Sequence, residues 1–163
     1  MSIYKLLYQS PIGTLTITSN DQHLLSISFS NDKDTLEDVP ATLPLILAVR
    51  WLDAYFRGKP ESAESIPTLF SGSDFQKQCW HELCRIPYGQ TITYKELANR
   101  VGTRRGVTHM SCQAVGQAIR KNAFAILIPC HRVIGSNGNL TGYVWGLDFK
   151  KELLAHEAKK CCD

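Results

Sequence analysis

Segment 58–74, which is rich in proline, glycine, serine and glutamate, separates two stretches of this chain whose hydrophobic patterns differ. Before the segment, residues 3–8, 13–18 and 24–29 are strand-like and are separated by turn residues, whereas residues 43–56 have helical periodicity. These patterns predict an antiparallel meander of strands with one helix. After the segment the pattern becomes mainly helical.

The length of the chain, 163 residues, suits one domain of ordinary size or two small ones. Because the pattern changes across a linker-like segment, we expect two domains, residues 1–72 and 73–163. Their charges differ as well. Residues 1–74 hold 5 Lys or Arg and 9 Asp or Glu, a net charge of −4, whereas residues 75–163 hold 13 and 6, a net charge of +7. A basic second half is weak evidence for a polyanionic partner such as nucleic acid.

The second half contains a candidate helix-turn-helix. Helices are expected at about residues 75–84, 94–101 and 112–121, each preceded by a serine or threonine that can cap it. A basic, glycine-containing loop, 102–108, joins the second helix to the third. Such a pair can bind DNA, although two helices joined by a loop are common in α-rich domains. Gly116 inside the third helix indicates either tight helix packing or close approach to a nucleic-acid backbone.

No apolar run approaches the roughly 20 residues that span a membrane, and the N-terminus lacks a signal-peptide pattern. We therefore expect a soluble protein in the cytoplasm with no membrane partner. The six cysteines are expected to be reduced thiols there. Their spacing contains no CxxC pair, so we expect no metal and no other cofactor.

The stretch around Cys130 carries the strongest chemical signal. Residues 126–128 are apolar and predict a buried strand that delivers the thiol to a turn. A lone cysteine in this setting is usually a core residue. Here His131 can act as a base, and Arg132 adds positive charge that favours the thiolate. The histidine needs an acceptor to orient it, and the sequence leaves three candidates: Asp148, Glu152 and Glu157.

The run Pro-Cys-His-Arg-Val at residues 129–133 resembles the signature of the O6-alkylguanine-DNA alkyltransferases, also called methylated-DNA–protein-cysteine methyltransferases. The specific resemblance covers roughly residues 73–158, and the first half is similar only loosely. It rests also on family-like segments at residues 75–80, 86–89, 93–98, 114–116, 137–143 and 153–157.

The resemblance implies an α+β fold, with a small N-terminal ribonuclease-H-like sheet and helix domain followed by a mainly helical winged helix-turn-helix domain. It implies repair of O6-methylguanine in double-stranded DNA. Whether O4-methylthymine is repaired as well is left open. The damaged base is flipped out, and the alkyl group is transferred irreversibly and stoichiometrically to Cys130 of a monomeric protein.

The resemblance also implies roles for single residues. Cys130 is the acceptor nucleophile, and His131 is the base that acts on the thiol through a water molecule. Glu157 holds the histidine. Asn122 is the hinge between the recognition helix and the active-site segment. Tyr94 rotates the phosphate and protonates the departing guanine. Taken singly, the histidine, tyrosine and glutamate each have an ordinary structural explanation, and only their joint spacing favours these roles.

A second group of residues is expected to contact DNA or the damaged base. Tyr143 lies near the alkylated oxygen, and the backbone carbonyls of Cys130 and Val133 read the guanine amine. Val144 and Trp145 replace the small residues that are usual in the family. Val144 has no hydroxyl, so only its backbone N–H could bond to guanine O6, and Trp145 is expected to narrow the pocket. The full group is Gln113, Ala114, Gly116, Arg120, Arg132, Val133, Tyr143, Val144 and Trp145.

Two other functions are consistent with parts of the sequence. A winged-helix protein that binds DNA or flags lesions without chemistry would explain the basic helices but not Cys130. A Cys-His hydrolase would explain the thiol but lacks an evident oxyanion site and leaves the basic helix-turn-helix unexplained.

Gln113 stands where the family usually has an arginine that fills the gap left by the flipped base. Arg104 or Arg105, from a loop about five residues longer than usual, is the alternative occupant. Because glutamine adds no charge, we expect Gln113→Arg to bind the same lesion duplex more tightly than the natural chain. Fluorescence anisotropy titration measures this difference, and unchanged affinity would contradict the expectation.

Overall fold

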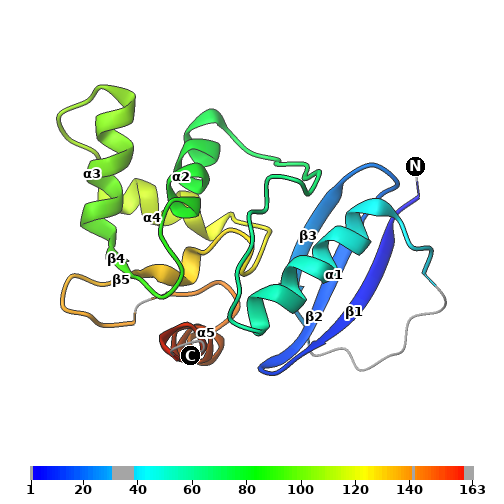
Figure 1. Ribbon diagram of the computed structural model, residues 1–163. Helices are drawn as coiled ribbons and strands as arrows, with labels where there is room; N and C mark the ends of the chain where they lie inside the picture. Colours follow the sequence, from blue (N-terminus) through cyan, green and yellow to red (C-terminus); the bar gives the residue numbers. More distant parts are fainter. Residues whose placement is uncertain (1, 31–38, 141, 160–163) are drawn as a thin grey trace. The chain divides into compact units, whose positions relative to one another are not determined.

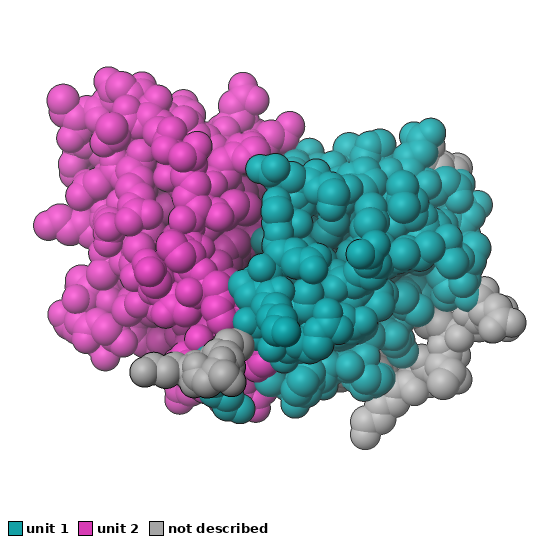
Figure 2. Space-filling model, viewed as in Figure 1, with its two compact units in different colours: residues 1–70, 123–127, 159–163 teal, residues 71–122, 128–158 magenta. Residues whose placement is uncertain are grey.

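The computed structural model describes residues 2–30, 39–140 and 142–159, so Cys161 and Cys162 lie outside the described residues. The chain divides into two compact units (Figure 2). The first contains the described residues of 1–70 and 123–127 together with Lys159, and the second contains residues 71–122 and 128–158.

The first unit is built on a three-stranded antiparallel sheet in the order β1-β2-β3 (Figure 1). The strands are β1 (Tyr4–Ser10), β2 (Gly13–Ser19) and β3 (Leu24–Phe29), and the helix α1 (Leu43–Phe56) follows them. Alternate residues of β2 are buried, as expected for a sheet with one covered face. The predicted meander and helix are therefore confirmed. The sheet and α1 share a core that includes Leu15, Ile17, Ile27, Leu45, Ala48 and Leu52.

A later part of the chain also belongs to the first unit. Residues 123–127 run beside β3, where Ile27 donates to the Ala123 carbonyl at 3.0 Å and accepts from the Ala125 N–H at 2.8 Å. The Phe124 ring packs edge-on against Phe70, with 5.4 Å between the ring centroids. A single cut at residue 72 does not describe this return of the chain, because the pairing joins segments almost 100 residues apart in sequence.

The strand expected at residues 126–128 is wrong. Ile126 has a φ of 70°, and the N–H of Leu127 bonds to the carbonyl two residues earlier at 2.7 Å, which is a γ-turn. A second such turn follows around Pro129, where the Cys130 N–H bonds to the Ile128 carbonyl at 2.8 Å. All three apolar side chains are buried. Their hydrophobicity therefore reflects burial and not strand structure.

The second unit is mainly helical, and its first three helices contact one another pairwise. The two short strands pair in parallel, Ile92 with Val133 and Thr93 with Ile134. Together the two units confirm the expected α+β class. The elements are α2 (Asp74–Cys84), β4 (Ile92–Thr93), α3 (Tyr94–Arg105), α4 (Cys112–Arg120), the 3-10 helix η1 (Cys130–Arg132), β5 (Val133–Ile134) and α5 (Leu147–Ala158).

The helix starts follow the sequence more closely than the helix ends. Ser73, Thr93 and Ser111 each accept a backbone N–H at the start of α2, α3 and α4. However, α3 continues through Arg105, so the first four residues of the expected loop 102–108 are helical. Gly102 does not end the helix; a Cβ there would lie 3.2 Å from Met110 of the following loop. Within the part of the chain that the structure describes, no helix meets the length and hydropathy of a membrane span.

Ser73 forms a full capping box with Gln76. The Ser73 hydroxyl accepts the Gln76 N–H at 3.1 Å, and the Gln76 side chain accepts the Ser73 N–H at 3.0 Å. We expect Ser73→Ala to lower the free energy of unfolding by about 1 kcal/mol, because α2 loses this cap. Urea denaturation measures the loss. Ser71→Ala, at an exposed position before the helix, is the control, and an equal effect of both substitutions would contradict the capping explanation.

Candidate active site and DNA interface

The turn at Pro129 leads directly into η1, and this places the Cys130 thiol inside the second unit. Cys130 is only 7% exposed. Asn122, which follows α4, donates from Nδ2 to the Ile128 carbonyl at 3.0 Å and to the Cys130 Sγ at 3.4 Å. One buried amide therefore fixes both the turn and the sulfur that follows it. Asn122 lies between α4 and the segment that leads to the thiol, and its role as a hinge stays a prediction.

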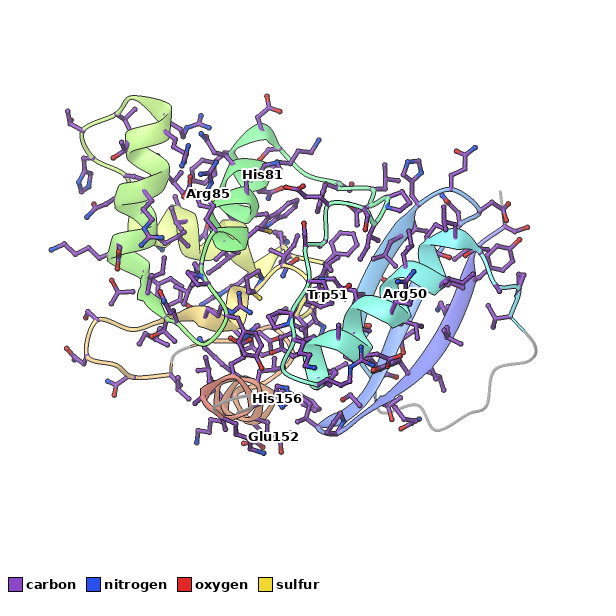
Figure 3. The ribbon with its side chains drawn as sticks, viewed as in Figure 1. Arg50, Trp51, His81, Arg85, Glu152 and His156 are labelled. Atoms are coloured by element: carbon purple, nitrogen blue, oxygen red, sulfur yellow. The ribbon has the colours of Figure 1, made fainter. Side chains whose placement is uncertain are left out.

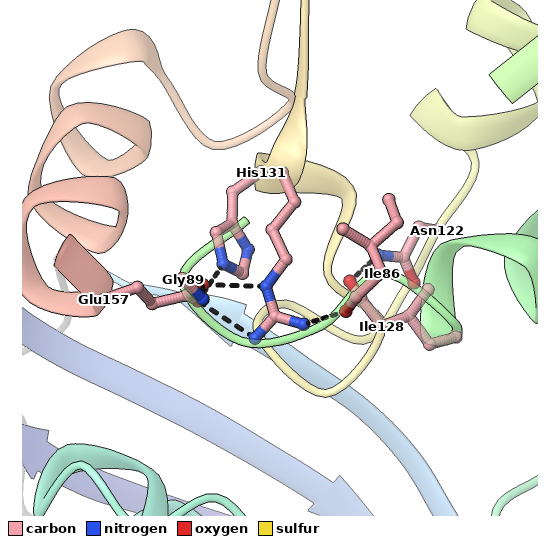
Figure 4. Close-up of polar contacts among 7 residues, drawn as sticks. Ile86, Gly89, Asn122, Ile128, His131 and Glu157 are labelled. Atoms are coloured by element: carbon pink, nitrogen blue, oxygen red, sulfur yellow. Dashed lines mark hydrogen bonds and ion pairs between the residues drawn. The ribbon is translucent and has the colours of Figure 1, made fainter. Parts of the chain in front are cut away.

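His131 is fully buried beside Glu157. Its Nε2 lies 2.5 Å from the Glu157 Oε2 (Figure 4). The carboxylate reaches it from the buried face of α5, whereas Asp148 and Glu152 are exposed residues of the same helix. Of the three acidic candidates, the structure therefore brings only Glu157 to the histidine.

Arg132 binds the same carboxylate from another side. Its Nε and Nη2 donate to the two oxygens of Glu157 at 2.8 and 3.1 Å, and its Nη1 donates to the Ile86 carbonyl at 2.7 Å. The Gly89 N–H also donates to Glu157, at 3.0 Å. The sequence grouped Arg132 with the residues that contact DNA or substrate. In the structure it is 7% exposed, and its guanidinium holds the buried carboxylate in place.

Burial and the surrounding positive charges favour a neutral histidine in this cluster. Burial raises the pKa of Glu157, but the His131 hydrogen bond and the Arg132 guanidinium outweigh it and hold that pKa well below its usual range. Burial lowers the pKa of His131, which Glu157 opposes only in part. A neutral His131 donates its Nε2–H to Glu157, so Nδ1 carries the lone pair. Nδ1 is buried and has no hydrogen-bond partner among the described residues, so it can accept a proton.

Burial raises the pKa of the Cys130 thiol to about 11, although the Asn122 hydrogen bond and the charge of Lys150 oppose the shift. At neutral pH the resting residue is therefore a thiol. Because only the thiolate is strongly nucleophilic, the sulfur needs a base at the moment of reaction. The free Nδ1 of the adjacent His131 is suited to that task.

Lys150 is a buried cation that the sequence reasoning missed. It is 0% exposed, and its Nζ donates to the carbonyls of Val133 at 2.7 Å and Gly142 at 3.1 Å. It therefore ties the residue after η1 to the loop before α5, and it occupies one acceptor position of the Val133 carbonyl. A signal was present: Lys150, Leu153 and Glu157 have helical spacing and form the buried face of α5.

Several residues expected to contact DNA line one pocket of about 370 Å³ beside α4. A Cβ at Gly116 would lie 3.9 Å from the Tyr94 ring, an ordinary contact distance, so packing does not require glycine there. Of the two explanations for Gly116, tight packing is thus not supported. Ala114 is not among the lining residues. The pocket is lined by Tyr94, Cys112, Gln113, Gly116, Gln117, Arg120 and Gly142.

The segment after Gly142 holds the remaining expected pocket residues. The Tyr143 hydroxyl is buried without a hydrogen-bond partner among the described residues, and burial raises its pKa well above the usual value. The Trp145 ring packs on Tyr143, with 5.3 Å between centroids. Val144 is 53% exposed. The polar end of Tyr143 is therefore inside the unit, whereas Val144 is at its surface.

Arg104 and Arg105 are the alternative residues for filling the gap that the flipped base leaves in the DNA. Both side chains instead contact residues of α2. Arg104 forms an ion pair with Glu82, and Arg105 donates to Gln78 at 2.9 Å and lies over the Phe75 ring. This leaves Gln113 as the candidate that lines the pocket.

Within residues 2–30, 39–140 and 142–159, the His, Cys, Asp and Glu side chains form no group of three or more that could hold a metal ion. The expectation that the protein needs no cofactor stays a prediction.

Comparison with known proteins places this site in a family. The model of the DNA binding domain of 6-O-methylguanine DNA methyltransferase matches residues 74–159, and the model of its ribonuclease-like domain matches residues 3–70. The chain belongs to the 6-O-methylguanine DNA methyltransferase family. Both domain models agree with the expected fold, a ribonuclease-like N-terminal domain and a DNA-binding helical domain.

Individual relatives resemble the chain over nearly its whole length. A methylated-DNA–protein-cysteine methyltransferase from Methanosarcina barkeri is 44% identical over 160 residues, which are 95% of this chain and 97% of the relative. One from Haemophilus influenzae is 36% identical, covering 96% and 87%. The crystal structure of Mycobacterium tuberculosis OGT in complex with DNA has a TM-score of 0.76 and 36% identity, covering 93% of this chain and 91% of that one.

The buried clamp of Arg132 on Glu157 gives a stability prediction. Arg132→Met leaves a buried carboxylate without its main counter-charge, so we expect a loss of about 3–5 kcal/mol in the free energy of unfolding. Arg100→Met breaks an exposed pair with Glu96 and should change it by less than about 1 kcal/mol. Urea denaturation compares them. If Arg132→Met does not fold, the double variant Arg132→Met/Glu157→Gln should recover folding, and its failure to do so would refute the clamp.

The raised pKa of Cys130 gives a pH prediction. Since the thiolate fraction grows about tenfold per pH unit below the pKa, the rate of Cys130 carbamidomethylation by iodoacetamide should rise about tenfold per unit from pH 7 to about pH 10. Quantitative mass spectrometry of the Cys130 peptide separates this rate from those of the exposed Cys84 and Cys112. A plateau below pH 9 would show that the thiolate is already formed in the resting protein.

Proposed function

We propose that this protein repairs DNA by transferring the methyl group of O6-methylguanine irreversibly to its own Cys130, once per molecule. The observation that carries the proposal is the buried Cys130, fixed by Asn122 and followed by a His131–Glu157 pair, in the same unit as the pocket beside α4. The relatives named methylated-DNA–protein-cysteine methyltransferase support the activity. A relative solved in complex with DNA supports the partner.

In the proposed step, the Cys130 S–H bond breaks and its proton moves to the Nδ1 of His131, directly or through a water molecule. The sulfur attacks the methyl carbon, so an S–C bond forms as the C–O bond breaks. The electron pair of that bond goes to O6, and the departing guanine takes up a proton. Glu157 stabilises the imidazolium that forms, and Arg132 holds Glu157 in place. The product is guanine in DNA and S-methylcysteine at position 130.

The substrate base must leave the DNA stack to reach the thiol. O6 of guanine faces the major groove inside the stack, whereas Cys130 is only 7% exposed. Flipping a base costs a few kcal/mol, and less for a lesion that pairs poorly. Tyr94 and Tyr143 are the proposed contacts to the phosphate and the flipped base, and Tyr94 the proton donor to guanine. Gln113, Gly116 and Arg120 would hold the duplex from α4.

Further expectations complete this proposal. The protein acts as a monomer in the cytoplasm and divides into a first, ribonuclease-H-like domain, residues 1–72, and a DNA-binding and acceptor domain, residues 73–163. Trp145 limits the size of the alkyl group, the backbone N–H of Val144 bonds to guanine O6, and Ala114 and Val133 complete the DNA and base contacts. Transfer from O4-methylthymine would follow the same bond changes.

The competing functions differ in what happens to Cys130. A lesion-binding protein without chemistry leaves the thiol unmodified, and a Cys-His hydrolase restores it after each cycle. The pocket beside α4 and the relatives named methylated-DNA–protein-cysteine methyltransferase favour transfer from a DNA base.

Mass spectrometry separates these functions. After incubation with a duplex containing O6-methylguanine, we expect the peptide that holds Cys130 to gain one methyl group, with no more than one equivalent of substrate consumed. Cys130→Ser should show no gain, and Cys84→Ser, which changes an exposed thiol at the end of α2, should behave like the natural chain. An unmodified Cys130 peptide, or substrate turnover beyond one equivalent, would rule out the proposed function.

A further inference from the structure

A second pocket, of about 530 Å³, lies between α2 and α3. Its lining is almost entirely charged and comprises Glu82, Arg85, Arg100, Thr103 and Arg104. None of these residues lines the pocket beside α4, and none belongs to the cluster around Cys130. We refer to it below as the arginine pocket.

A buried carboxylate orients the arginines of this pocket. Glu82 is 2% exposed, forms an ion pair with Arg104, and lies 3.8 Å from the Nε of Arg85. The guanidinium groups themselves remain accessible, since the side chains of Arg85 and Arg104 are 58% and 46% exposed. The pocket is therefore a preorganised set of donors and not a closed internal ion pair.

Positive charge exceeds negative charge along this surface. Glu82 and Glu96 face three arginines, because Arg100 pairs with Glu96 on the rim at 2.8 Å. Lys77 and His81 precede Arg85 at four-residue spacing and extend the basic row along α2. Figure 3 shows His81 on α2 and Arg85 at the end of that helix.

We propose that the arginine pocket is a second DNA site, which binds backbone phosphates independently of the lesion. A guanidinium presents planar paired donors that match phosphate oxygens, so three convergent arginines suit this ligand. The row from Lys77 to Arg85 is about 12 Å long, from the 1.5 Å rise per residue, which suits several phosphates along a strand and exceeds the size of one free phosphate ion. The proposal rests on the proposed function only in taking DNA as the partner.

The salt dependence of binding to an undamaged duplex tests this site. Each phosphate contact contributes about 0.9 to the slope of log K against log salt concentration. We expect Arg85→Gln/Arg100→Gln to reduce that slope by about 1 to 2. Arg104 is left intact because it pairs with the buried Glu82. The control Lys5→Gln/Lys59→Gln removes the same charge from exposed positions of the first unit and should reduce the slope by less than half as much.

Three outcomes would overturn the site: an unchanged slope in the pocket variant, an equal reduction in the control, or a pocket that takes only small anions. The last is recognised if inorganic phosphate raises the melting temperature of the natural chain but not of the variant, while the slope for DNA is the same in both. Methyl transfer from free O6-methylguanine base is measured in parallel. It should be equal in the natural chain and the variant, and its absence in both would count against the proposed function and not against this site.

Discussion

The buried carboxylate of Glu157 is the interaction on which the second unit depends. It accepts from His131, from two nitrogens of Arg132 and from the Gly89 backbone, and so joins α5 to η1 and to the turn before β4. A carboxylate removed from water is strongly unfavourable unless charge and hydrogen bonds replace its hydration. Here both are supplied by the two residues that follow the reactive cysteine. The fold and the reactive group are therefore held by the same contacts.

This arrangement explains why His131 is suited to be a base and not a fixed cation. If Glu157 faced the histidine alone, its charge would favour a permanent imidazolium. Because burial lowers the pKa of His131 and Arg132 already neutralises the carboxylate, His131 keeps an uncharged ring whose Nε2 is engaged and whose Nδ1 is available. Lys150 also contributes positive charge near the sulfur, and it is held by the backbone carbonyls of Val133 and Gly142. The thiol thus lies among groups that can stabilise a transient negative charge without forming it in advance.

Local patterns in the sequence predicted local structure well. The meander, the helix starts at Ser73, Thr93 and Ser111, and the α+β class follow from periodicity, capping residues and family resemblance. The strand predicted at residues 126–128 was wrong because a run of buried apolar residues does not have to form a strand. Residues 126–128 are apolar because they are enclosed, yet their backbone forms tight turns.

The residue roles that could not be predicted from the sequence depend on tertiary contacts. A glycine at 102 looked like a helix end, but it leaves room for Met110. The structural roles of Arg132 and Lys150 could not be read from the sequence, because their partners lie 25 and 17 residues away and only the folded chain brings them together. The choice of Glu157 among three acidic residues of α5 was likewise decided by which helix face is buried.

The protonated state of Cys130 has a consequence for the working life of the molecule. A protein whose only acceptor reacts once is inactivated whenever that sulfur is oxidised by a peroxide or alkylated by an unrelated electrophile. Oxidation and adventitious alkylation both proceed through the thiolate, which is scarce when burial holds the proton on the sulfur. Burial therefore protects the acceptor: the sulfur stays protonated and weakly reactive in the resting protein, and it becomes a nucleophile only when a base and a substrate are in place together.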